Sequence, residues 1–131
     1  MNLEDIRSAI MATISSNWAT CSPICFPNQP FISPQGNWIR PTIKMGDTLV
    51  GEIGEDGIGM RVGLLMISVF GLPGEGTKTL LGYASRLEAI FRKKEISGIV
   101  FNEPSSDITG LDDNGYFGLI VNVDFTTWVG E

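Results

Sequence analysis

The sequence predicts an α+β fold: a mixed, mainly antiparallel sheet with a long β-hairpin, flanked by two helices. Three observations lead to this prediction. Apolar residues recur at helical spacing in two separate segments. Alternating or wholly apolar runs, typical of strands, lie between and after them. Glycine-rich turns join neighbouring runs, and a length of 131 residues suits one domain spanning 1–131, since domains commonly hold ~100–150 residues.

The first helix is expected over residues 3–16, with Asn17 ending it. Its apolar stripe consists of Leu3, Ile6, Ile10 and Ile14. Residues 18–37 contain four prolines, which repeatedly interrupt regular structure. Within them, only Cys25–Phe26 is expected to form a short extended piece.

Two extended stretches follow. Trp38 to Lys44 alternates, and Pro41 lies within it. Because proline cannot donate to a strand ladder, this strand should lie at a sheet edge or be locally irregular. Thr48–Ile53 is a second stretch, and the turn signal Glu55-Asp56-Gly57 separates it from the next strand. Together they predict a long hairpin, residues 46–60, reaching from the body of the domain.

Arg61–Phe70 is the most apolar run. One of its faces carries Leu64, Met66 and Phe70, and the other carries Leu65, Ile67 and Val69. Apolar residues on both faces indicate burial on both sides. One side should therefore receive helices, and the other needs a further layer or another subunit.

The second helix is expected from 78 to about 94, capped by Thr77. Its buried stripe consists of Leu80, Ala84, Leu87, Ile90 and Phe91, with Tyr83 beside it. Ile99–Phe101 is a short apolar run, and 103–114 is polar enough to predict a loop. Tyr116–Trp128 should be a long closing strand. Its apolar face consists of Phe117, Leu119, Val121, Val123 and Phe125.

The charge balance disfavours several classes of function. A net charge of −6 repels a phosphate backbone, so tight sequence-specific DNA binding is not expected. The chain has no histidine, the commonest general base and metal ligand. The pair Cys21 and Cys25 is expected to be two reduced thiols. The N-terminal segment lacks the apolar core of a signal peptide, and no run is long enough to span a membrane.

One motif invites a nucleotide-binding interpretation. Gly71-Leu-Pro-Gly-Glu-Gly76-Thr77-Lys78-Thr79 follows a buried strand and precedes a helix, as a phosphate-binding P-loop does. Thr77, however, separates Gly76 from Lys78, and one inserted residue rotates a helical side chain by ~100°. Pro73 also lacks an N–H that could contact a phosphate. A tight turn followed by a helix cap is the favoured interpretation.

The remaining polar clusters have simple structural explanations. The acidic residues at the hairpin tip are too few for a calcium site and suit a solvated turn. The acidic residues of 107–113 suit a polar loop, and the serines have no histidine to activate them. The basic trio Arg92–Lys94 suits a helix C-terminus better than a nucleic-acid patch. No catalytic residue, cofactor site or metal site is predicted, and the chain is not expected to be an enzyme.

The order of these features resembles the tail-terminator-like proteins of long-tailed bacteriophages, similar in layout to the lambda-type tail terminator. The resemblance rests on the first helix, Trp38-Ile39-Arg40, the glycine-rich hairpin, Val69-Phe70 before Pro73-Gly74, and the Ala84–Phe91 helix. It implies a hexameric ring on the head-proximal end of the tail tube. Such a ring stops tube polymerisation and joins the tail to neck or head-completion proteins.

The resemblance also implies a protein of the virion, at the tail–neck junction after assembly in the host cytoplasm. DNA would pass the lumen without specific binding, and no cofactor or membrane is involved. The candidate interface residues are Trp38, Arg40, Glu52, Glu55, Asp56, Arg61, Pro73 and Glu75. Three alternatives stay open: a head–tail connector or head-completion protein of the neck, a nucleotide-binding domain using Gly71–Thr79, and a cellular adaptor domain.

Overall fold

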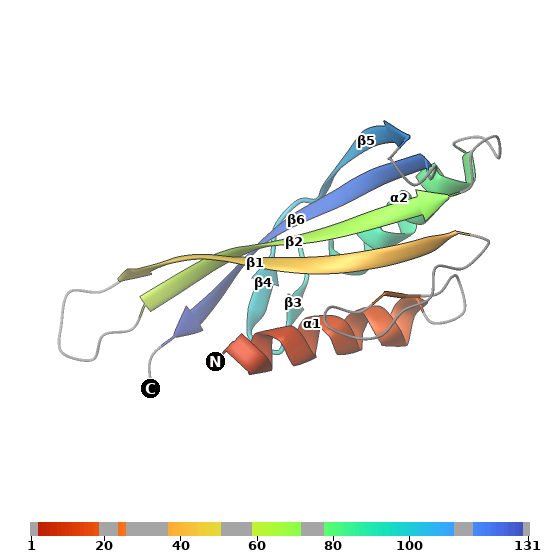
Figure 1. The fold of residues 1–131 in the computed structure, drawn as a ribbon. Coiled ribbons are helices and arrows are strands. Elements are labelled where there is room, and N and C mark those ends of the chain that lie inside the picture. The colour runs from red at the N-terminus through yellow and green to blue at the C-terminus, as the bar shows by residue number, and fades with distance from the viewer. Residues whose placement is uncertain are drawn as a thin grey trace.

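The computed structural model describes residues 3–18, 24–25, 37–50, 59–71, 78–111 and 117–129. Its elements, in chain order, are α1 (Leu3–Trp18), β1 (Trp38–Val50), β2 (Gly59–Gly71), α2 (Lys78–Phe91), β3 (Glu95–Ile96), β4 (Ile99–Phe101), β5 (Ser105–Leu111) and β6 (Phe117–Val129). Figure 1 shows the long strands β1, β2 and β6 running side by side.

The strands form one six-stranded sheet. Its order is β1-β2-β6-β4-β3, and β5 pairs with β6 beside β4. Every pairing between these strands is antiparallel. Among the described residues, the parallel contact is the isolated bridge between Ile24 and Ile39. The predicted α+β class, with a mainly antiparallel sheet and two helices, is confirmed.

Both helices pack on the same face of the sheet, which gives the molecule two layers (Figure 1). The buried strand residues that meet the helices are Ile39, Leu65, Ile67, Val69, Ile99, Phe101, Leu119, Val121, Val123 and Phe125. Each such side chain contributes ~1.5–3 kcal/mol by leaving water. The predicted apolar face of β6 is therefore confirmed for Leu119, Val121, Val123 and Phe125; the side chain of Phe117 is not among the described ones. Of the two apolar faces predicted for β2, the one with Leu65, Ile67 and Val69 meets the helices.

Helix α1 runs two residues further than predicted and ends at Trp18. Its buried face consists of Ile6, Ile10, Met11, Ile14 and Trp18. Leu3, predicted in the stripe, is instead 55% exposed because it occupies the first helical position, where the stripe has not yet reached the core. The fully buried Trp18 meets Tyr83 of α2 edge-to-face, with ring centroids 5.0 Å apart. This contact joins the two helices.

Helix α2 ends at Phe91, three residues before the predicted end. Arg92 and Lys93 form a turn, in which Lys93 has a φ of 51°. A left-handed residue cannot continue a right-handed helix, so the backbone turns here toward β3. The buried residues Leu80, Ala84, Leu87 and Phe91 confirm most of the predicted stripe, while Ile90 and Tyr83 are half-buried.

The two extended stretches predicted between Trp38 and Ile53 are one strand, β1, with a register shift between Met45 and Thr48. It pairs with β2 up to Val50 and Gly59, which confirms the hairpin. The predicted turn at 55–57 lies outside the described residues. In Figure 1, the C-terminal ends of β1 and β6 and the N-terminal end of β2 extend beyond the N-terminal end of α1.

Pro41 lies in the edge strand, as its missing N–H predicts. The carbonyl of Ile39 faces away from β2, because it accepts a hydrogen bond of 2.8 Å from the Cys25 N–H. Residues two apart in a strand direct their backbone polar groups to the same side. The missing N–H of Pro41 therefore faces outward and removes no bond between β1 and β2.

The polar segment predicted as a loop over 103–114 contains strand β5, so that prediction was wrong. Ser105 to Ile108 are exposed and show no apolar alternation. Backbone pairing with β6 from Ser105↔Asn122 onward makes them a strand, and the Asn122 side chain adds a hydrogen bond to Asp107. Side-chain patterns carry no signal for such an edge strand.

A glycine lets one large ring fill the middle of the core. Gly63 of β2 lies opposite Phe125 of β6. A Cβ at Gly63 would lie 2.4 Å from the Phe125 ring, far inside van der Waals contact. The absence of a side chain here leaves room for a ring that is fully buried.

Candidate assembly interface

The face of the sheet opposite the helices is covered by no described element. Strand alternation places one residue set of each long strand on this open face. On β1 these are Trp38, Arg40, Thr42 and Lys44; on β2 they are Val62, Leu64, Met66, Ser68 and Phe70; on β6 they are Ile120, Asn122, Asp124 and Thr126. The alternate residues of each strand point to the opposite side of the sheet, where they form the core or pack against it.

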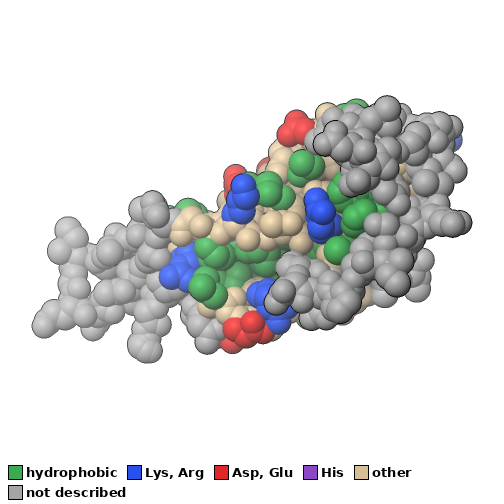
Figure 2. Space-filling model, in the orientation of Figure 1, with side chains coloured by type: hydrophobic (Ala, Val, Ile, Leu, Met, Phe, Trp, Pro, Cys, Tyr) green, Lys and Arg blue, Asp and Glu red, His purple; other side chains and the backbone are tan. Residues whose placement is uncertain are grey.

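The centre of the open face is apolar. Leu64, Met66 and Ile120 are half-buried although no described layer lies over them. Val100 of β4, which pairs with Thr126, is 39% exposed on the same face. Figure 2 shows hydrophobic side chains at the surface beside Lys and Arg side chains. Helices thus cover one side of the two-sided apolar strand β2, and no described element covers the other side.

An aromatic stack occupies one corner of this face. The rings of Trp38 and Phe70 lie 4.3 Å apart between centroids and are nearly parallel. The guanidinium carbon of Arg40 lies 5.2 Å from the centre of the Phe70 ring, a cation–π contact. Trp38 is only 6% exposed, so it supports Phe70 and Arg40 and offers little surface of its own.

Charges of opposite sign border the open face. Arg40 and Lys44 are exposed on β1, the edge strand. Asp124 on β6 and Asp107 on β5 are exposed toward the other edge. The carboxylate of Asp107 accepts a long hydrogen bond, 3.5 Å, from the Asn122 side chain. The face is therefore basic along β1 and acidic along β5 and β6.

A hollow of about 480 Å³ opens between Lys44 and Asp124. Its lining includes Gly46, Val62 and Leu64 together with these two charged residues. Gly46 is needed here because a Cβ would lie 2.9 Å from the Val62 carbonyl oxygen. The hollow is large enough for side chains of a neighbouring protein and has one charge of each sign at its rim.

The predicted interface residues lie in different places. Trp38 and Arg40 are together on the open face, at the Phe70 stack. Arg61 is half-buried and pairs with Thr48 and Thr127, in the row that belongs to the helix side. The other candidates, Glu52, Glu55, Asp56, Pro73 and Glu75, lie outside the described residues.

Sequence reasoning missed three border residues: Lys44, Asp107 and Asp124. The alternation of Trp38–Lys44 and of Tyr116–Trp128 already places Lys44 and Asp124 on the faces opposite the core. That signal could have named both. Asp107 had no such signal, because β5 itself was not predicted.

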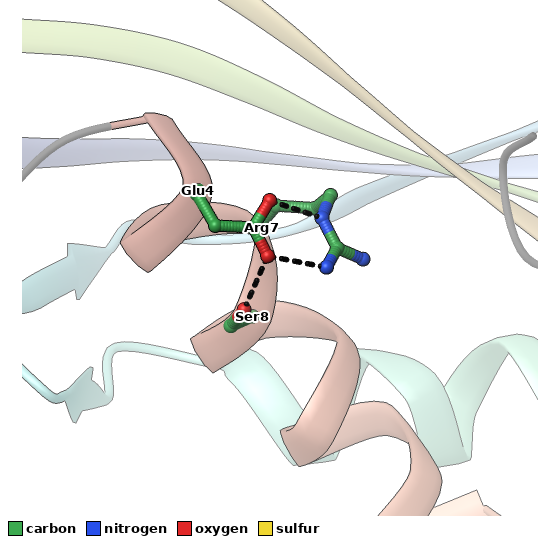
Figure 3. Close-up of polar contacts among 3 residues, drawn as sticks. All are labelled: Glu4, Arg7 and Ser8. Atoms are coloured by element: carbon green, nitrogen blue, oxygen red, sulfur yellow. Dashed lines mark hydrogen bonds and ion pairs between the residues drawn. The ribbon is translucent and has the colours of Figure 1, made fainter.

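Two polar clusters lie on the helices, away from the open face. On α1, Glu4 accepts hydrogen bonds from Arg7, at 2.6 and 3.0 Å, and from Ser8, at 2.9 Å (Figure 3). These bonds, that from Arg7 first, lower the pKa of Glu4 to about 2. Near the end of α2, Arg92 pairs with Glu88 at 2.9 Å and with Glu103 at 2.8 Å. Both clusters are explained by local helix and turn stabilisation.

The glycine loop after β2 does not sit in the setting of a P-loop. β2 pairs antiparallel with both of its neighbours, whereas a βαβ unit needs parallel strands. A Cβ at Gly71 would lie 2.9 Å from the side chains of Leu80 and Asn37, so close packing already explains this glycine. Residues 72–77 lie outside the described residues.

Other site types find no support in the part of the chain that the structure describes. There, no three Cys, Asp or Glu side chains gather as metal ligands. Neither described helix has the length and hydrophobicity of a transmembrane helix. Cys25 carries a free, half-buried thiol, and Cys21 lies outside the described residues.

Comparison with known proteins identifies the family. The model of the phage tail terminator protein family matches residues 5–125. A solved structure superimposes on the chain with a TM-score of 0.75 and 18% sequence identity, covering 100% of this chain and 99% of that chain. At this identity the likeness concerns the fold alone. No curated protein matches the sequence. Because the family match spans well over half of the sequence, the chain belongs to the phage tail terminator proteins.

Proposed function

We propose that the chain forms a ring that caps the head-proximal end of the phage tail tube, stops tube polymerisation and joins the tail to the neck. Family membership gives it a structural role in tail assembly. The observation that carries the finer proposal is the open face, where half-buried Leu64, Met66 and Ile120 lack a covering layer among the described elements. An uncovered apolar surface of this kind marks a contact with another protein.

The physics of termination requires an asymmetric ring. A tube built by head-to-tail stacking grows until its end is covered by something that does not present a new growing face. A ring whose one face matches the tube, and whose other face matches a neck protein, ends the series. The partners of the chain are then further copies of itself, the tail tube protein and a neck or head-completion protein.

The acidic charge of the chain suits a ring through which DNA passes. A hexamer would carry 6 × −6 = −36 formal charges. Repulsion between this charge and the phosphate backbone lets DNA move through the lumen without binding. The protein is accordingly a component of the virion, at the tail–neck junction, and reaches it from the host cytoplasm during assembly.

Mass in solution tests the ring. Light scattering behind a sizing column, at several concentrations and with added tail tube protein, should reveal a species near six times the 14.2 kDa monomer. Phage lacking the protein should make tails of abnormal length, and the wild-type chain should restore them. A chain that stays monomeric with tube protein present, or tails of normal length without it, contradicts the proposal. Binding to neck proteins but not to the tube would instead indicate a connector.

The hairpin tip is the expected contact with a neighbour or with the tube. Deleting residues 53–58 should abolish ring or tube contacts while the monomer stays folded by circular dichroism. A deleted chain that still terminates tails at normal length counts against this role.

Replacing Glu55 and Asp56 by lysine tests whether this acidic pair faces the lumen. Slower DNA ejection is expected, and unchanged ejection and infectivity would contradict a lumen position for the pair.

A further inference from the structure

We propose that neighbouring copies in the ring meet through the two charged borders of the open face: Arg40 and Lys44 of one copy, the basic border, against Asp107 and Asp124 of the next, the acidic border. The inference rests on the proposed ring and specifies which surfaces of the chain close it. It commits to a second copy of this chain as the partner.

The borders are matched in spacing along the strands. Arg40 lies in one row across the sheet with Ser68, Ile120 and Asp107. Lys44 lies in another row with Leu64 and Asp124. The two rows are four residues apart on both β1 and β6, which is roughly 13 Å along a strand at ~3.3 Å per residue. Moving one copy sideways across its strands therefore brings Arg40 toward Asp107 of the next copy, and Lys44 toward Asp124, which lies one strand further in.

The opposite charges do not neutralise each other within one copy. Strands lie ~4.8 Å apart, so two strand spacings separate Lys44 from Asp124 and three separate Arg40 from Asp107, roughly 10 and 14 Å. Among the described residues, no ion pair joins any of these four side chains to a partner. Each border keeps its charge for an external partner.

The borders also lie toward opposite sides of the sheet, with Asp107 on the outer strand β5 and Asp124 on the inner strand β6. β1 is an edge strand, and beyond the bridge of Ile24 to Ile39 no described residue pairs with its outer side. β5 pairs with β6 alone. A ring needs a head-to-tail contact between two different surfaces of the same chain, and borders on opposite sides of the sheet provide it.

Charge sign favours a second copy over nucleic acid as the partner. A phosphate backbone would be attracted to Arg40 and Lys44 but repelled by Asp107 and Asp124 on the same face. Another copy supplies the complement of both borders at once. Pairing of opposite charges also offsets the mutual repulsion of chains that each carry −6.

Charge exchange tests the contact. The first variant carries Arg40→Asp and Lys44→Glu, and the second carries Asp107→Lys and Asp124→Lys. Each variant alone sets like charges against each other, so the concentration for half-assembly should rise about tenfold or more. In an equimolar mixture every contact pairs opposite charges again, and the six-fold mass should return. All four side chains are exposed, so both variants should keep wild-type circular dichroism.

The control variant Arg86→Asp with Lys94→Glu changes net charge as the first variant does, at exposed positions off the sheet face. It should assemble like the wild type, and 0.5 M salt should weaken assembly of the wild type and of the mixture alike. If the wild type forms rings and each charge variant alone assembles equally well, the border contact is wrong, although the ring itself stands. A mixture that stops at twice the monomer mass overturns the head-to-tail arrangement. A wild-type chain that remains monomeric with tube protein overturns both the ring and the contact.

Discussion

Replacing Gly63 by alanine should destabilise the fold, whereas the same replacement at Gly82 should stabilise it. At Gly63 the new Cβ would lie 2.4, 2.8 and 3.0 Å from three carbons of the Phe125 ring. The ring is 0% exposed and cannot move into solvent. At Gly82, on the exposed side of α2, the new Cβ would meet nothing within 4 Å.

The size of each effect follows from these distances. Carbon atoms in contact prefer ~3.5–4.0 Å, so the ring or the strand must shift by about 1 Å. Such overpacking costs ~1–3 kcal/mol, and the lower backbone entropy of alanine offsets ~0.5–1 kcal/mol of it. Because a 2.4 Å approach to a fully buried ring belongs to the upper half of that range, ~2–3 kcal/mol, the net loss for Gly63→Ala is about 1–2.5 kcal/mol. For Gly82→Ala only the favourable term remains, a gain of ~0.5–1 kcal/mol in a helix.

Urea unfolding followed by tryptophan fluorescence measures both changes, and the same slope with urea would show that the unfolded states are comparable. The double variant Gly63→Ala with Phe125→Leu should lose less stability than the sum of the two single replacements, because the smaller side chain leaves space for the methyl group. Equal stability of the wild type and Gly63→Ala, or a double variant whose losses simply add, would refute the packing argument.

Three further predictions concern the helices. Glu4 should titrate near pH 2 by NMR, and Arg7→Gln should raise that midpoint, because the hydrogen bond from Arg7 is the main cause of the low pKa. Since the folded pKa lies below the ordinary value of 4.5, the stabilisation by this pair is present above about pH 4.5 and disappears as pH falls toward 2. Arg92→Ala should cost no more than ~1 kcal/mol, and less in salt, because its side chain is 49% exposed; a large, salt-independent loss contradicts this. Trp18→Ala should cost ~3–5 kcal/mol in thermal unfolding, since it removes a fully buried ring from Tyr83, and a loss under 1 kcal/mol would show that the helices do not depend on it.

Patterns that reflect burial were readable from the sequence. The alternation from Leu119 to Phe125 and the helical spacing from Leu80 to Phe91 both mark faces that meet the core, and the structure buries them. The two-sided apolar run of β2 also indicated correctly that helices cover one side only. Pro41 marked an edge strand because the proline backbone itself lacks a donor.

Features that depend on the backbone alone were not readable. β5 is held by hydrogen bonds to β6 while Ser105 to Ile108 stay exposed, so its side chains follow no pattern. The end of α2 was placed too late because Lys93 adopts a positive φ that its residue type does not announce. Of the two charged borders, only Arg40 was a candidate. The alternation could also have named Lys44 and Asp124, but matching them in rows across the sheet requires the strand register, which the sequence alone does not give.

The place of β6 in the sheet constrains the order in which the molecule can form during synthesis. β6 is later in the chain than every other described strand, yet it lies between β2 on one side and β4 and β5 on the other. The ribosome can release the β1–β2 hairpin early, but the two halves of the sheet have no shared partner until residues 117–129 emerge. Until then β2 and β4 present open edges, the kind of surface on which nascent chains aggregate. Completion of the sheet is thus a late event, tied to the arrival of its most central strand.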